Sequence, residues 1–335
     1  MSGKALKRKT GVKNLDRFRE AGMAVAIALL CILVQSRNSN FFTSENISDL
    51  FTNTAILSIL SVGMMMVIIS RGIDLSIGST LAISGMVVTK LMIVYPGMPI
   101  FAAFLLGILI GAVCGGVIGA LIAYGKLPPI IASLGMMNAY RGIAFLISEG
   151  VWVSAHQMTD GFKRIATGSL LGVNNLIVIA VLINVAAYLF LTFSAAGRRI
   201  YAVGNNAEAA LISGIKSQRV LFMIYTIMGA LAGLAGILWV SKYASAQGNT
   251  AAGYEMNVIA ACVLGGVSVY GGVGKISGLV LGILFYGTLT NSLPMLNVSP
   301  FVQQAIQALL ILGAILLNVM IKRRMQANNR RRRNI

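Results

Sequence analysis

The sequence is poor in charge, and above all in acidic residues. Only 11% of its 335 residues are charged, and Asp and Glu together number nine, against 27 Lys and Arg. A soluble globular domain has about 25% charged residues, and a soluble chain of this length has too much surface to cover with so few. The scarcity of charge excludes an ordinary soluble enzyme or binding domain.

Histidine and cysteine are also scarce. The chain has a single His, His156, and three Cys, at positions 31, 114 and 262, with no metal-ligand spacing among them. It contains no HExxH motif, no nucleophile–base–orienter set and no GxxxxGK[ST] phosphate loop. We therefore expect no metal site, no catalytic residue, no cofactor and no ATP hydrolysis of its own by that route.

Long apolar runs without a charge fill much of the chain, for example 100–123 and 171–193. Such runs approach or reach the roughly 20 residues that span the hydrocarbon core as a helix. They do not alternate, which excludes a β-barrel, and helices satisfy their own backbone groups in lipid. We predict an all-α polytopic membrane protein. About ten transmembrane helices are expected, near 21–36, 48–69, 73–94, 98–124, 129–148, 171–193, 220–240, 256–270, 276–292 and 300–321.

The net charge of +18 lies at the ends of these runs, which argues against nucleic-acid binding. With an even number of spans, 21 of the 27 Lys and Arg fall on the side of the two termini. The positive-inside rule then predicts that both termini are cytoplasmic. We expect basic tails at 1–20 and 322–335 around one transmembrane domain, 21–321, with a cytoplasmic loop at 194–219.

Glycines recur every four residues at Gly107, Gly111, Gly115 and Gly119, and more loosely from Gly229 onward. Small residues on one helix face let two backbones approach closely in lipid. The pattern favours helix packing over a lipid or substrate groove.

The long inner loop contains a short helical segment, AEAALISG, at 207–214. The preceding Asn205 and Asn206 can cap its start, and Gly214 can end it. The segment is either a simple surface element or a docking element for a cytoplasmic partner.

Two glycine-rich interruptions, at 71–79 and 265–278, lie in the two halves of the chain. Such broken helices at matching positions are typical of inverted repeats and mark transport routes. Asp74 and Arg141 are ionisable residues within the membrane, where charge is costly and often functional. The candidate pathway or gate residues are Asp74, Ser76, Ser133, Asn138, Arg141, Gly265 and Gly266.

Structural alternatives remain open for both charges. Asp74 could form a salt bridge with Arg71 or cap a helix that starts at Leu75. Arg141 could offer donors to a hydroxylated solute together with Ser133 and Asn138, or pair with an acid elsewhere.

Four blocks carry a family resemblance over nearly the full length. They are RGIDLSIGS at 71–79, GKLPPIIASLGMMNAYRGIAFLISEG at 125–150, YAVGNNAEAALISGIKSQRV at 201–220 and GYEMNVIAACVLGGVSVYGGVGKISG at 253–278. In order and spacing the chain resembles the permease subunits of bacterial ABC importers for simple sugars, the ribose, xylose, galactose and autoinducer-2 group.

The resemblance implies a subunit of the bacterial cytoplasmic membrane that pairs with a second permease chain. A separate ATPase would bind ATP and Mg²⁺, and an extracytoplasmic binding protein would deliver the sugar to outer loops such as 149–170 and 241–254. The ATPase-coupling residues would be Gly204, Asn205, Asn206, Ala207, Glu208, Ala209, Ala210, Leu211, Ser213 and Gly214. Within them Glu208 would contact the ATPase, with Ala209, Ala210 and Leu211 packed into its groove.

Three other functions stay open. An ABC permease for another small solute, such as branched-chain amino acids, would have similar inner loops. A gradient-driven secondary transporter would use Asp74 as its coupling carboxylate. A membrane scaffold or receptor would bind a partner through 204–215 without transport.

Overall fold

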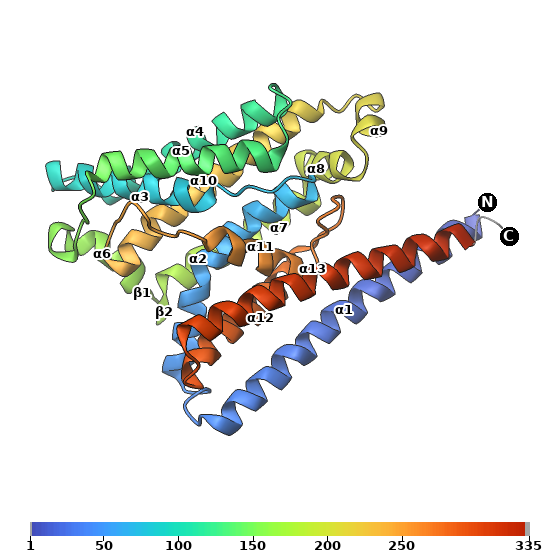
Figure 1. The fold of residues 1–335 in the computed structure, drawn as a ribbon, viewed down its shortest axis with the longest axis horizontal. Helices are drawn as coiled ribbons and strands as arrows, with labels where there is room; N and C mark the ends of the chain where they lie inside the picture. Colours follow the sequence, from blue (N-terminus) through green and yellow to red (C-terminus); the bar gives the residue numbers. More distant parts are fainter. Residues whose placement is uncertain (1, 332–335) are drawn as a thin grey trace.

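Helices make up nearly all of the regular structure (Figure 1). The computed structural model describes the backbone of residues 2–331, and the side chains of residues 19–313 together with those of Leu316 and Met320. The elements are α1 (Ser2–Arg37), α2 (Ser44–Ile69), α3 (Ile77–Val94), α4 (Ile100–Ala123), α5 (Pro129–Ser148), the 3-10 turn η1 (Ala155–Gln157), α6 (Asp160–Thr167), β1 (Ser169–Leu170), β2 (Val173–Asn174), α7 (Asn175–Phe193), α8 (Ala195–Asn205), α9 (Ala207–Ile212), α10 (Ser217–Tyr243), α11 (Tyr254–Leu264), α12 (Ile276–Met295) and α13 (Pro300–Arg331).

A helix lies at each of the ten predicted places, which confirms the all-α polytopic class. Among the described residues, however, only eight helices are long and apolar enough to cross a membrane: α1 from Arg19, α2, α3, α4, α5, α7, α10 and α12. Of the other two, α11 has only 11 residues, whereas α13 is long but its apolar stretch is described only over Pro300–Gly313. Eight of the roughly ten expected spans are thus found among the described residues, and α11 is shorter than a full span. The span expected in α13 and the inverted repeat stay predictions.

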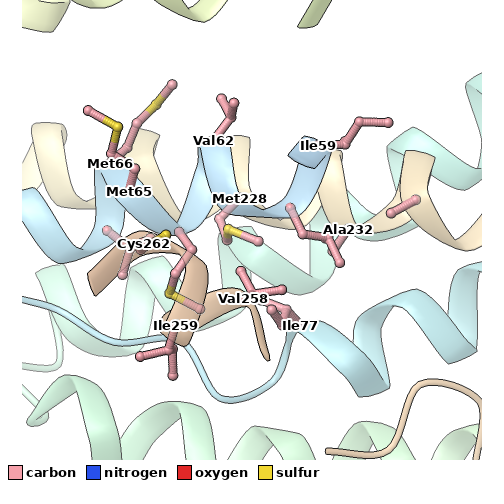
Figure 2. Close-up of a cluster of buried hydrophobic side chains, with 14 of the residues drawn as sticks. Ile59, Val62, Met65, Met66, Ile77, Met228, Ala232, Val258, Ile259 and Cys262 are labelled. Carbon is pink, nitrogen blue, oxygen red and sulfur yellow. The ribbon is translucent and has the colours of Figure 1, made fainter. Parts of the chain in front are cut away.

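The apolar core is built around α2, which runs through the middle of the molecule (Figure 1). From Thr54 to Ile69 nearly every residue of α2 is buried. Met65 and Val62 of α2 belong to the same cluster of buried side chains as Met228 of α10 and Cys262 of α11 (Figure 2). A span buried this fully needs apolar residues nearly all round, and the polar side chains between Thr54 and Ile69 are only the small hydroxyls of Thr54, Ser58 and Ser61.

The closest helix packing joins α4 to α10 through the predicted glycines. A Cβ at Gly111 would overlap the carbonyl oxygen of Gly229, and one at Gly115 would overlap that of Tyr225. Conversely, a Cβ at Gly233 would overlap the carbonyl oxygen of Gly107. The two backbones touch without side chains between them, so the interpretation of these glycines as a packing face is confirmed.

The glycine-rich stretch after α11 breaks that helix, as predicted. Gly266 has a φ of +81°, and its N–H and that of Val267 bond back to the carbonyls of Val263 and Cys262. This pattern is the glycine-terminated end of a helix. Residues 265–275 then continue without regular structure to α12, so the run expected at 256–270 is only partly helical.

The ends of the molecule differ in what they carry. In Figure 1, α8 and α9 lie at one end of the bundle, and α6, β1 and β2 lie at the other. The N-terminal end of α1 and the C-terminal end of α13 point towards the end that carries α8 and α9. Where described, the backbone of the two predicted tails is helical, because α1 begins at Ser2 and α13 continues to Arg331. The assignment of this end to the cytoplasm stays a prediction.

Candidate functional site

The short helix α9 forms where the loop sequence predicts it. The Asn206 side chain accepts hydrogen bonds from the backbone N–H groups of Glu208 and Ala209, at 3.0 and 3.1 Å, and so caps the first turn. Gly214, with a φ of +80°, donates to Leu211, and Ile215 donates to Ala210, which closes the last turn. Both ends of α9 are thus fixed by local sequence.

One face of α9 points away from the protein. Leu211 and Ile212 are 64% and 89% exposed, and Glu208 is exposed beside them. Ala210, by contrast, is only 4% exposed, because it faces the chain's own core. The expectation that Ala210 packs into a partner's groove is therefore corrected. The large apolar side chains that point outward from α9 are Leu211 and Ile212, and the smaller Ala207 and Ala209 are exposed as well.

The residues that precede α9 are anchored to two distant segments. Arg71, just after α2, donates from Nε to the Gly204 carbonyl at 2.7 Å and from Nη2 to the Asn205 carbonyl at 2.6 Å. The Gly272 N–H donates to the carbonyl of Ile69 at 2.8 Å. A Cβ at Gly204 would overlap this Ile69 oxygen, so only glycine allows the three segments to meet. Of the expected coupling residues, Gly204 and Asn205 thus form a junction within the permease.

Asp74 lies in the extended connector between α2 and α3 and is buried. Its Oδ1 accepts hydrogen bonds from the backbone N–H and the Oγ of Ser76, at 2.9 and 2.6 Å. The alternative of an Asp74–Arg71 salt bridge is wrong, because Arg71 turns to the end of α8. The capping alternative is close to what is found. Asp74 accepts a hydrogen bond from the backbone N–H of Ser76, the residue just before α3. The helix itself begins at Ile77 and not at Leu75.

Three candidate residues lie along α5. Ser133 is buried and donates to the carbonyl of Ile73, at 3.2 Å, so α5 holds the connector that contains Asp74. Asn138 is exposed, and among the described residues its side chain bonds to the carbonyl of Leu134 in its own helix. Arg141 donates from Nη1 to the carbonyls of Gly248 and Thr250, at 2.9 and 2.7 Å. Arg141 therefore holds the α10–α11 loop, and it makes no ion pair within the described part of the chain.

Gly265 and Gly266 do not face an open route. Both are buried, and a Cβ on Gly265 would meet the Gly278 carbonyl of α12 at 2.6 Å. A Cβ on Gly266 would collide with the Arg19 guanidinium of α1. These glycines serve close packing and a turn. Of the seven candidate pathway residues, Asn138 is exposed and Arg141 is half-buried, and the others are buried in contacts within the chain.

Sequence reasoning missed the partners of the end of α8. Tyr201 of α8 donates to the carbonyl of Gly274, at 2.9 Å, and adds to the junction made by Arg71 and Gly272.

Tyr225 of α10 was also missed. Its buried hydroxyl has no hydrogen-bond partner among the described residues. A Cβ at Gly72 would clash with this hydroxyl. In the sequence, Arg71 stands out as a cationic residue within a glycine-rich break. Its hydrogen-bond partners could not be predicted, because they are 133 and 134 residues away.

The loops at the opposite end are joined to each other. Val153 and Ala246 pair as an antiparallel bridge, with both N–O distances at 3.0 Å. In α6, the hydrogen bond and charge of Lys163 lower the pKa of Asp160 below its usual value. Trp152 and Leu171 are exposed on this end. The loops 149–170 and 241–254 therefore form one continuous surface.

Known proteins similar to this chain are transport permeases. The family model described as branched-chain amino acid transport system / permease component matches residues 46–317. The ribose import permease protein of Bacillus subtilis is 39% identical over 300 residues, 90% of this chain and 92% of the relative. That of Haemophilus influenzae is 35% identical over 314 residues, 93% of this chain and 97% of the relative.

A further relative is the autoinducer 2 import system permease protein of Salmonella typhi, 30% identical over 322 residues, 96% of this chain and 92% of the relative. No solved structure gives a significant match. The family match covers most of the chain, and the relatives are matched along almost their entire length. The chain therefore belongs to this family of permease components of bacterial ABC importers, which are multi-pass proteins of the cytoplasmic membrane.

Proposed function

We propose that this permease carries a simple sugar, a ribose-type monosaccharide or an autoinducer-2-like compound, into the cell. The observation that carries the proposal is the match to ribose and autoinducer 2 permeases over 90% or more of this chain. The description of the family model names branched-chain amino acid transport, but the relatives named above are sugar and autoinducer permeases. The alternative is an amino-acid permease with the same fold.

The energy would come from a separate ATPase that binds ATP and Mg²⁺, since this chain has no phosphate loop. We assign its docking to α9, whose Leu211 and Ile212 are exposed apolar side chains beside Glu208. An exposed pair of large apolar residues on a short capped helix suits insertion into a cleft of a partner. Closure of two ATPase domains would then displace α8 and α9.

Two further partners complete the proposal. A second permease chain, the same or a sister, would lie against this one, and the sugar would pass along their interface. The exposed Asn138 supplies a polar group on the outer face of α5 for such a route. An extracytoplasmic sugar-binding protein would sit on the continuous surface of the loops 149–170 and 241–254, where Trp152 is exposed. We expect no nucleic-acid partner, because the excess of Lys and Arg lies at the ends of the apolar runs.

The test is uptake by vesicles that contain this permease with its ATPase and binding protein. We expect ATP-dependent accumulation of radiolabelled ribose that excess unlabelled ribose or xylose suppresses and excess leucine does not. Accumulation of labelled leucine or valine, with suppression by the unlabelled amino acids, would instead assign the chain to the amino-acid transporters. Vesicles with an ATPase inactivated in its phosphate loop are the control.

A further inference from the structure

Arg71 occupies a backbone position where glycine is the usual residue. It follows Ser70, the C-cap of α2, with a φ of +68°, in the left-handed region. The N–H groups of Arg71 and Gly72 bond back to the carbonyls of Ile68 and Val67, both at 2.9 Å. In this helix-ending motif the left-handed residue is ordinarily glycine, because a Cβ is strained there. An arginine at this point is therefore explained by its side chain and not by its backbone.

The side chain holds the end of α8. Its two hydrogen bonds, at 2.7 and 2.6 Å, go to the carbonyls of Gly204 and Asn205, which are the last residues of α8. Cationic donors are favourable at the carbonyl end of a helix, and charge-assisted bonds of this length are strong. The next residue, Asn206, is the cap of α9. One residue thus separates the docking helix from the atoms that Arg71 holds.

The main chain after Arg71 leads directly to the buried connector. Two residues on, the carbonyl of Ile73 accepts the hydrogen bond of Ser133 on α5, and Asp74 follows. On the other side, Gly271 packs against the Arg71 side chain and Gly272 is bonded to the end of α2. Arg71 is therefore in contact with the end of α8, the break before α12, and the connector to α3.

We propose that Arg71 is the positioning residue that transmits a displacement of α9 to the connector between α2 and α3, and through Ser133 to α5. The proposal rests on the proposed function, in which an ATPase moves α9. The guanidinium makes two hydrogen bonds to adjacent carbonyls, so a shift of the end of α8 pulls on the Arg71 side chain and on the turn that carries it. Contiguous contact alone does not demonstrate coupling, and the experiment must therefore separate coupling from folding.

The variant Arg71→Gly separates them, because it keeps a backbone suited to the left-handed turn and removes only the side chain. Lys126→Gly is the matched control: Lys126 is also basic, exposed and left-handed, with a φ of +56°, but its side chain makes no hydrogen bond or ion pair to the residues that the structure describes. Each variant is purified with its ATPase and binding protein, and reconstituted in vesicles. ATP hydrolysis and ribose uptake are then measured on the same sample, with the melting temperature of the complex.

We expect Arg71→Gly to assemble and hydrolyse ATP, with ribose taken up per ATP reduced by about tenfold or more, while Lys126→Gly keeps the wild-type ratio. Arg71→Lys, with a compact charge that cannot reproduce the two-pronged contact, should give an intermediate ratio, and it replaces the glycine variant if that variant does not assemble. A wild-type ratio in Arg71→Gly, or in Arg71→Lys where the glycine variant does not assemble, overturns the inference. Absence of ATP-dependent uptake in the wild type overturns the proposed function first.

Discussion

Gly111 of α4 and Gly229 of α10 lie backbone against backbone, each in the space that the other's Cβ would need. The contact requires glycine on both helices, at positions that the four-residue repeat already indicated. Because α4 and α10 both also pack against α3, the packing of these three helices depends on the contact.

Substitution of one glycine in this contact should loosen the bundle. Gly111→Ala places a methyl group on the Gly229 carbonyl, and overpacking of this kind typically costs about 1–3 kcal/mol. Gly116→Ala in the same helix is the control, because its Cβ would meet nothing closer than Thr226 Oγ1 at 3.7 Å. The measurement is the melting temperature in detergent, expected to fall for Gly111→Ala and to hold or rise for Gly116→Ala. An equal response of both variants would contradict the contact.

Charge on the exposed face of α9 should release the ATPase. Leu211→Asp puts a carboxylate where an apolar contact is proposed, and should reduce co-purification of the ATPase at least tenfold while the permease stays inserted. Leu171→Asp is the control, since Leu171 is 97% exposed at the other end of the molecule. Retention of the ATPase by Leu211→Asp would move the docking site away from α9.

The coupling function of α9 can be tested without removing an apolar side chain. Glu208→Arg reverses an exposed charge, and Gly214→Pro removes the N–H that bonds to Leu211 and forbids a φ of +80°. Both variants should insert normally but lose ATP-dependent uptake. Normal uptake in either variant would argue against coupling through this helix.

Uptake by Asp74 variants distinguishes an ABC importer from a gradient-driven carrier. Asn at this position keeps the Oδ1 that accepts from Ser76, whereas Ala leaves buried donors unsatisfied at about 1–3 kcal/mol. We therefore expect Asp74→Asn to retain most uptake and Asp74→Ala to lose stability and uptake together. Uptake that is abolished in Asp74→Asn and by a proton uncoupler, yet survives ATP depletion, would instead identify a coupling carboxylate.

Arg141 should determine the order of the loop between α10 and α11. Arg141→Gln weakens the bonds to Gly248 and Thr250, each worth about 1.5–3 kcal/mol for a charged donor. Hydrogen exchange of residues 246–253 should become faster by tenfold or more. Arg164→Gln, an exposed arginine of α6, should leave it unchanged. Unaltered exchange in Arg141→Gln would show that Phe145, which packs on Gly248, is sufficient to hold the loop.

The sequence predicts those features that depend on neighbours along the chain. The spans follow from uncharged runs, and α9 follows from Asn206 and Gly214, because a helix cap involves residues within one turn. The use of the glycines of α4 and α10 as packing faces was also predictable, since they repeat along one face, although their pairing with each other was not. The break near Gly265 was visible in composition, although the apolar run before it suggested a longer helix than Tyr254–Leu264.

Features set by tertiary contact could not be found in this way. Whether Asp74 pairs with Arg71 or accepts backbone N–H bonds at the start of the next helix depends on where the end of α8 lies, and Arg71 reaches Gly204 across 133 residues of sequence. Likewise, the inward orientation of Ala210 depends on how α9 sits on the core. Arg141 has no acidic partner nearby in sequence, and its actual partners are backbone carbonyls that no residue pattern marks.

The central claim, that the chain works as the permease of an ATP-driven importer, is tested most directly by mass spectrometry of what co-purifies with it. The tagged chain is extracted gently from its native membrane, and the Leu211→Asp variant is processed in parallel. We predict recovery of an ATPase with a phosphate loop and of a sugar-binding protein with the wild type, and loss of the ATPase with the variant. Recovery of the wild-type chain alone, in material that still transports sugar without ATP after reconstitution, would contradict the account.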